Sequence, residues 1–128
     1  MRFVYYLSAD HAMPLEDCRM TWHTPARQGA FGFLLEETEP YPTELAFLHA
    51  LPEVYRLELL KDPETMSVLK AYLEETMAPG TQVQLWQVAT NRSRSRRPCL
   101  YRGKLSELSG DTFQLLFGSE ELCIQIEY

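Results

Sequence analysis

Arginine is the residue type best suited to bind anions, and this sequence concentrates it in one short stretch. The guanidinium group is planar, pairs with a phosphate or carboxylate through two parallel hydrogen bonds, and stays charged at any ordinary pH. Half of the twelve basic residues lie in this stretch, and no Asp or Glu occurs between residues 76 and 105. The six basic residues are Arg92, Arg94, Arg96, Arg97, Arg102 and Lys104. We therefore expect them to form a surface that contacts an anionic partner.

The arginines between residues 92 and 97 are interleaved with serine and have no apolar neighbours that would bury them. The sequence predicts an exposed, arginine-rich hairpin loop over residues 91–98, joining two strands. For the run itself, a loop whose charge serves only solubility is the interpretation that the pattern favours, because runs of charge are commonly solvated, and an anion-binding arm is the functional alternative. Only Trp86 and Tyr101 lie close enough in sequence to stack on bases, so nothing indicates base reading. We expect an acidic protein face as the partner, ahead of nucleic-acid phosphates.

A second group of chemically capable residues lies between residues 10 and 27. It contains Asp10, His11, Cys18 and His23, which would serve a small enzyme or a ligand-binding domain if the segment folded back on itself. Their spacing matches no zinc pattern, and no nucleophile signature surrounds the cysteine. We therefore expect no metal here. The competing interpretation, which we favour, is a long surface loop over residues 8–28 whose apolar side chains pack onto a sheet.

The rest of the chain is strongly acidic. Outside the basic stretch there are six basic and eighteen acidic residues, hence a net charge of −12, against −6 for the whole chain. This balance argues against general binding to nucleic acid or to an anionic membrane. It leaves open an acidic inhibitor or immunity-type protein that faces a basic partner. Four carboxylates cluster around a predicted turn: Glu36, Glu37, Glu39 and Glu44. We expect them either to be solvated or to attract the arginines of a second copy in a homodimer.

The composition indicates a single domain over residues 1–128. The chain is 45% hydrophobic, which suffices for a core without a disulfide or a metal. Its three cysteines are odd in number and widely spaced, as is typical of reduced thiols in a cytoplasmic protein. The first residues form too short an apolar run for a signal peptide, and no run is long enough to span a membrane.

Apolar periodicity and turn residues predict an α+β fold with a mixed, mainly antiparallel sheet, two helices and a C-terminal antiparallel meander. The best-defined helix follows Asp62 and Pro63, ends before Pro79, and has its apolar stripe at Met66, Leu69, Leu73 and Met77. The other helix is expected over residues 44–51. Strands are expected over residues 3–7, 30–36, 53–60, 81–90, 98–105, 113–117 and 122–126.

No nucleotide-binding loop, nucleophile elbow, zinc-protease motif or calcium loop occurs in the sequence. We therefore assign no catalytic residue and no cofactor, and we favour binding over catalysis. The sequence predicts a small cytoplasmic interaction or accessory domain. The alternatives are a small enzyme or ligand-binding domain that uses the 10–27 segment, and the acidic inhibitor.

Overall fold

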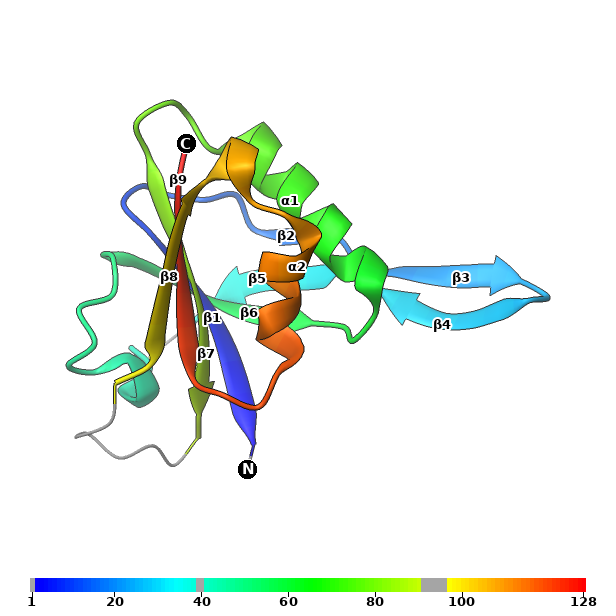
Figure 1. Ribbon diagram of the computed structural model, residues 1–128, viewed down its shortest axis with the longest axis horizontal. Helices are drawn as coiled ribbons and strands as arrows, with labels where there is room; N and C mark the ends of the chain where they lie inside the picture. Colours follow the sequence, from blue (N-terminus) through cyan, green and yellow to red (C-terminus); the bar gives the residue numbers. More distant parts are fainter. Residues whose placement is uncertain (1, 39–40, 91–96) are drawn as a thin grey trace.

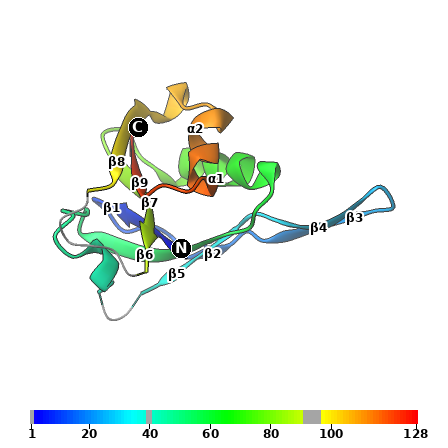
Figure 2. The same cartoon turned by 60° about the horizontal axis from the view of Figure 1, so that its bottom comes forward.

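The computed structural model describes residues 2–38, 41–90 and 97–128 (Figure 1). A seven-stranded sheet forms its centre, and two α-helices cover one face of that sheet (Figures 1 and 2). The main hydrophobic core lies between the sheet and these helices. The predicted α+β class, with a mixed and mainly antiparallel sheet, is therefore confirmed.

The strand order in the sheet is β2-β5-β6-β1-β7-β9-β8, and every pair of neighbours is antiparallel except β8 and β9. These strands are β1 (Phe3–Ala9), β2 (Glu16–Asp17), β5 (Phe33–Glu37), β6 (Glu53–Leu59), β7 (Gln82–Ala89), β8 (Cys99–Lys104) and β9 (Leu122–Glu127). The alternation of buried and exposed residues along β6 matches the period of a half-buried strand.

Helix α1 (Pro63–Thr76) begins where the sequence predicts. The Asp62 side chain accepts a hydrogen bond from the Glu64 amide, and Pro63 occupies the first turn, where no amide hydrogen is needed. The predicted apolar stripe is confirmed, because each of its four members is buried: Met66, Leu69, Leu73 and Met77. The helix thus closes the core above the sheet.

The other face of the sheet carries a smaller apolar cluster that includes Tyr6, Leu45, Trp86 and Val88. Residues 41–52, between β5 and β6, cover this cluster, and the one regular element within that described range is the 3₁₀ turn η1 (Thr43–Leu45). The helix expected over residues 44–51 is therefore wrong. Phe47 and His49 have positive φ angles of 68° and 57°, which a right-handed helix cannot contain.

The C-terminal meander is also wrong. Residues 113–117, expected as a strand, belong to helix α2 (Gly110–Gln114) and the 3₁₀ turn η3 (Leu115–Phe117). Ser109 caps α2 by accepting a hydrogen bond from the Thr112 amide. Because α2 returns the chain to the opposite end of the sheet, β9 runs parallel to β8 instead of antiparallel. Strand β9 also separates β7 from β8, so residues 91–98 do not connect a hairpin.

The segment 8–28, expected as a long loop, contains strands instead. After the short β2, strands β3 (Met20–Thr24) and β4 (Arg27–Phe31) form a two-stranded ribbon that projects away from the main sheet (Figures 1 and 2). The Trp22 ring packs on Phe31, with 4.7 Å between centroids, and the Arg27 guanidinium lies 4.1 Å over the Trp22 ring. Arg27 and Trp22 also donate to Asp62 Oδ2, which ties the ribbon to the start of α1.

Candidate functional site

Arg97 and Arg102 line one cleft of about 580 Å³ on the sheet face that the helices leave uncovered. Strands β7, β9 and β8 provide its floor, and residues 47–49 form its opposite wall. Two guanidinium groups beside one cleft can hold an anion through bidentate hydrogen bonds. The described part of the chain therefore brings two of the predicted basic residues to a single concave site.

The floor of the cleft is held by a buried hydrogen-bond network. Ser8 Oγ donates to Gln84 Oε1 over 2.7 Å and accepts from Trp86 Nε1 over 2.9 Å. Gln84 Oε1 also accepts from the Leu51 amide over 2.9 Å, which ties the wall segment to the floor. Because its oxygen already has two donors, the further hydrogen-bonding capacity of Gln84, which lines the cleft, lies in its amide NH₂ group.

The wall is anchored at its start by Tyr6 and Glu44. Burial, followed by the charge and hydrogen bond of Glu44, raises the pKa of Tyr6 to about 12. The phenol therefore stays protonated at neutral pH and donates to Glu44 Oε2 over 3.1 Å. This contact holds the wall segment against β1 and leaves the far end of the segment, at residues 47–49, beside the cleft.

Backbone strain gathers at that far end. Phe47 and His49 are the only non-glycine residues with positive φ in the described ranges, and both line the cleft. Such residues are uncommon, cost about 1–3 kcal/mol each, and cluster at ligand sites. Phe47 is also 71% exposed, although it is among the largest apolar side chains. The wall is thus held in a conformation that local sequence preference opposes.

The basic side of the cleft comes from β8. Side chains alternate between the faces of a strand, so Leu100, Arg102 and Lys104 share the cleft-side face. Arg102 stands opposite Gln125 of β9 and is exposed. Burial raises the pKa of the neighbouring Cys123 thiol to about 12, and the charge of Arg102 opposes that shift. The positive charge of Arg102 therefore acts on Cys123 at the floor of the cleft.

The predicted basic surface is only partly described. Arg97, Arg102 and Lys104 are exposed, and the first two line the cleft. Arg92, Arg94 and Arg96 lie outside the described residues. Sequence reasoning missed Gln84, Gln125 and His49, because Gln84 on β7 and Gln125 on β9 become partners only through strand pairing.

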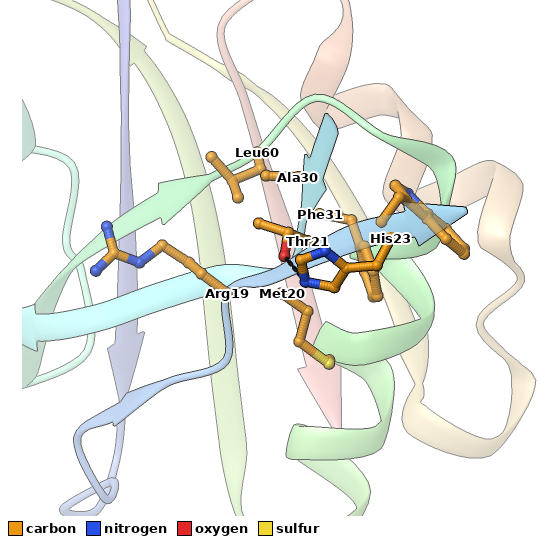
Figure 3. Close-up of a pocket in the computed structure, with 8 residues that line it drawn as sticks. Arg19, Met20, Thr21, His23, Ala30, Phe31 and Leu60 are labelled. Atoms are coloured by element: carbon orange, nitrogen blue, oxygen red, sulfur yellow. Dashed lines mark hydrogen bonds between the residues drawn. The ribbon is translucent and has the colours of Figure 1, made fainter. Parts of the chain in front are cut away.

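The residues of the alternative site lie at three separate places. Asp10 Oδ1 contacts His11 Nδ1 at 2.7 Å beside the start of β7, and Cys18 Sγ contacts Glu16 at 3.4 Å. His23 lies on the projecting ribbon, where its Nε2 is 2.6 Å from Thr21 Oγ1 (Figure 3). Within the described ranges, no three His, Cys, Asp or Glu side chains gather in a group that could hold a metal.

A second hollow, of about 720 Å³, lies against the ribbon (Figure 3). Its lining is mainly apolar and includes Met20, Phe31 and Leu60. His23 faces it from β3, but its hydrogen-bonding partner there is a threonine hydroxyl, not a carboxylate.

The acidic residues near the turn are partly engaged within the protein. Glu44 accepts the Tyr6 hydrogen bond, and Glu36 lies 3.9 Å from Arg56 Nε. Glu37 is exposed, and Glu39 lies outside the described residues. In the part of the chain that the structure covers, no helix combines the length and apolar character needed to cross a bilayer.

Comparison with protein-family models, with curated proteins and with solved structures finds no match to this chain. The geometry of the cleft is therefore the basis on which a function is assigned.

Proposed function

We propose that this protein is a cytoplasmic interaction domain that binds an anionic partner at the cleft between β8 and residues 47–49. The observation that carries this proposal is the convergence of Arg97 and Arg102 on one concave surface. Gln84, Gln125 and Trp86 line the same cleft, and Gln125 Nε2 donates to Gln82 Oε1 over 3.3 Å. Guanidinium groups, together with neutral amide donors and an aromatic ring, form a suitable binding site for a carboxylate or phosphate group.

The charge distribution supports the same proposal. The chain carries a net charge of −6, so a purely electrostatic attraction of anions to the whole molecule is excluded. An anion that binds must instead meet a local positive surface that outweighs the field of the remainder. Such an attraction is screened by salt over a Debye length of about 8 Å at physiological ionic strength. Binding should therefore weaken as salt concentration rises.

The test uses paired charge removals and retention on a heparin column. Arg97→Ser with Arg102→Ser removes two positive charges from the cleft, whereas Arg19→Ser with Arg56→Ser removes two from exposed positions elsewhere. We expect the wild type and the second variant to be retained at low salt and to elute by about 0.15 M. The first variant should flow through while keeping the wild-type melting temperature.

A larger variant extends the test to the rest of the basic stretch. Replacing Arg92, Arg94, Arg96 and Arg97 by serine should also abolish retention without unfolding the protein. Two results contradict the proposal: no retention of the wild type at low salt, or an equal loss of retention in both paired variants. Unfolding of the fourfold variant would instead assign those arginines a structural role.

A further inference from the structure

We infer that the partner is an extended acidic protein segment that adds as one more strand to the outer edge of β8. This inference rests on the proposed function, because Arg102 and Lys104 supply charge at that edge. It goes further in naming the partner as a peptide chain and in naming the backbone as a source of affinity. Strand addition of this kind draws its affinity from main-chain hydrogen bonds and its specificity from alternate side chains.

The first step concerns which backbone groups β8 leaves open. The Cys99 amide donates to the Glu121 carbonyl over 3.1 Å, so the N–H and C=O of Cys99, Tyr101 and Gly103 face β9. In a strand, the groups of the intervening residues point to the other side. The N–H and C=O of Leu100, Arg102 and Lys104 therefore point away from the sheet. Among the described residues, only β9 pairs with this strand.

The second step compares the two edges of the sheet. The opposite edge strand, β2, has two residues, which is one of the ways in which proteins blunt an edge. Strand β8 has six residues, and Leu100 and Tyr101 on it are 51% and 36% exposed. Strand β8 contains no proline, and among the described residues no strand pairs with its outer edge. Its length and its exposed apolar side chains make it a template for another strand.

The third step decides what kind of strand fits. Pairing β8 with β8 of a second copy would bring Arg102 and Lys104 of both copies together, and like charges on paired strands are destabilising. An acidic segment instead gains opposite-charge pairs at the same positions. The edge therefore selects against a second copy of itself and in favour of an acidic partner.

The alternation of β8 also predicts the pattern of the partner. On the cleft side, the side chains of the partner would stand beside Leu100, Arg102 and Lys104 of β8. The two basic residues favour Glu or Asp at alternate positions of the partner. On the side that faces the helices, the side chains of the partner would stand beside the exposed Tyr101 and beside Gly103, which has no side chain. These neighbours favour apolar residues in the partner. The predicted ligand is thus a segment in which acidic and apolar residues alternate.

The experiment measures binding of a capped, fluorescent eight-residue peptide of alternating Glu and Val by anisotropy at low salt. Two further peptides carry N-methyl groups, one on every Glu amide and the other on every Val amide. Because an added strand uses only one of its edges, we expect one methylated peptide to lose at least about tenfold in affinity and the other to bind like the parent. Equal binding of all three peptides overturns the inference.

The protein side of the test uses Leu100→Pro and its matched control, Leu100→Ala. Proline at this position removes an outward N–H but no hydrogen bond to β9, and edge strands tolerate such prolines. Both variants keep every charge. We expect Leu100→Pro to bind the peptide at least about tenfold more weakly than Leu100→Ala, which loses the same side-chain contact but keeps the N–H, with both still retained on heparin.

The remaining outcomes separate this inference from the proposed function. Undiminished peptide binding by Leu100→Pro, with heparin retention intact, overturns strand addition and leaves anion binding in place. Binding of a twenty-nucleotide single-stranded DNA but not of the peptide also overturns it. If wild-type protein binds neither peptide, DNA nor heparin, the proposed function fails as well. Should Leu100→Pro not fold, the two methylated peptides still decide.

Discussion

Ser8 and Gln84 show how single polar residues shape the cleft. Ser8 is fully buried, yet its hydroxyl is needed because it bridges the Trp86 indole and the Gln84 carboxamide. Through Gln84, the same network reaches the Leu51 amide at the end of the wall segment. Together with the Tyr6–Glu44 contact, the Ser8 hydroxyl in β1 therefore helps to set the position of the wall relative to the floor.

We predict that Ser8→Ala costs about 1–3 kcal/mol in the free energy of unfolding, because it leaves the buried Trp86 N–H without its acceptor. The measurement is a urea unfolding curve. Ser67→Ala, at an exposed position of α1, is the control and should change stability by less than about 0.5 kcal/mol. Equal effects of the two substitutions would show that the network contributes nothing.

The three cysteines should differ in reactivity because they differ in environment. Burial and the Glu16 carboxylate raise the pKa of Cys18 to about 11, and burial raises that of Cys123 to about 12. Cys99 is exposed on β8. Since the thiolate is the reactive form, we expect one fast thiol per chain with Ellman's reagent at pH 8, and three in denaturant.

The fast phase should disappear in Cys99→Ser and persist in Cys18→Ser. A fast phase that survives in Cys99→Ser would mean that one of the two shielded thiols is accessible to the reagent.

At the scale of elements, substitutions in α1 test whether its predicted apolar stripe packs against the sheet. Leu73 is fully buried in the core, and Glu74 beside it is exposed. We predict that Leu73→Ala costs about 2–5 kcal/mol, whereas Glu74→Ala changes stability by less than about 0.5 kcal/mol. Urea midpoints that reverse this ranking would contradict the packing of α1 against the sheet.

Elements with strong local signals could be predicted, and those whose signals were short or ambiguous could not. Asp62 and Pro63 specify the start of α1 because capping is a local interaction. Phe113, Leu115 and Phe117 alternate as a strand would, but the two fully buried residues are Phe113 and Leu116, three positions apart as on a helix. Five residues cannot distinguish these two periods, so the cap at Ser109 decided the outcome.

The candidate site could be predicted in its charge but not in its shape. Arg97 and Arg102 were identified from composition alone, because a basic stretch in an acidic chain needs no fold to be visible. Their neighbour Gln84 depends on the insertion of β9 between β7 and β8, which joins segments distant in sequence. Such long-range pairing leaves no local signature.

At the scale of the whole molecule, stability comes from two apolar clusters on opposite faces of one sheet. The three cysteines are free, and no metal-binding group is found among the described residues. We therefore predict that the melting temperature changes by less than about 2 °C with excess chelator or with reductant, a shift that corresponds to about 0.5 kcal/mol for a chain of this size. A sharp drop with chelator would reveal a structural metal.

The contact between the ribbon and α1 makes the shape of the molecule sensitive to acid. The Glu64 amide, against a smaller opposing effect of burial, holds the pKa of Asp62 below its ordinary value, and Arg27 and Trp22 add to this effect. The stability that this carboxylate contributes is therefore fully present above its unfolded pKa of about 3.9. It is lost as pH falls through the lower folded pKa.

Protonation of Asp62 would thus weaken its hydrogen bonds with Trp22 and Arg27, which hold the ribbon of β3 and β4 to the start of α1. The ribbon would then move more freely relative to the main sheet. We expect heteronuclear NOE values of ribbon amides to fall as pH drops through the folded pKa of Asp62, below its ordinary value, while those of β1 stay high. Asp62→Asn should reproduce the loosened ribbon at pH 6, and Glu74→Gln should not. If ribbon amides of Asp62→Asn are as rigid at pH 6 as those of the wild type, the Trp22–Phe31 packing and not Asp62 sets the direction of the ribbon. The direction in which the ribbon projects from the main sheet would then be independent of pH.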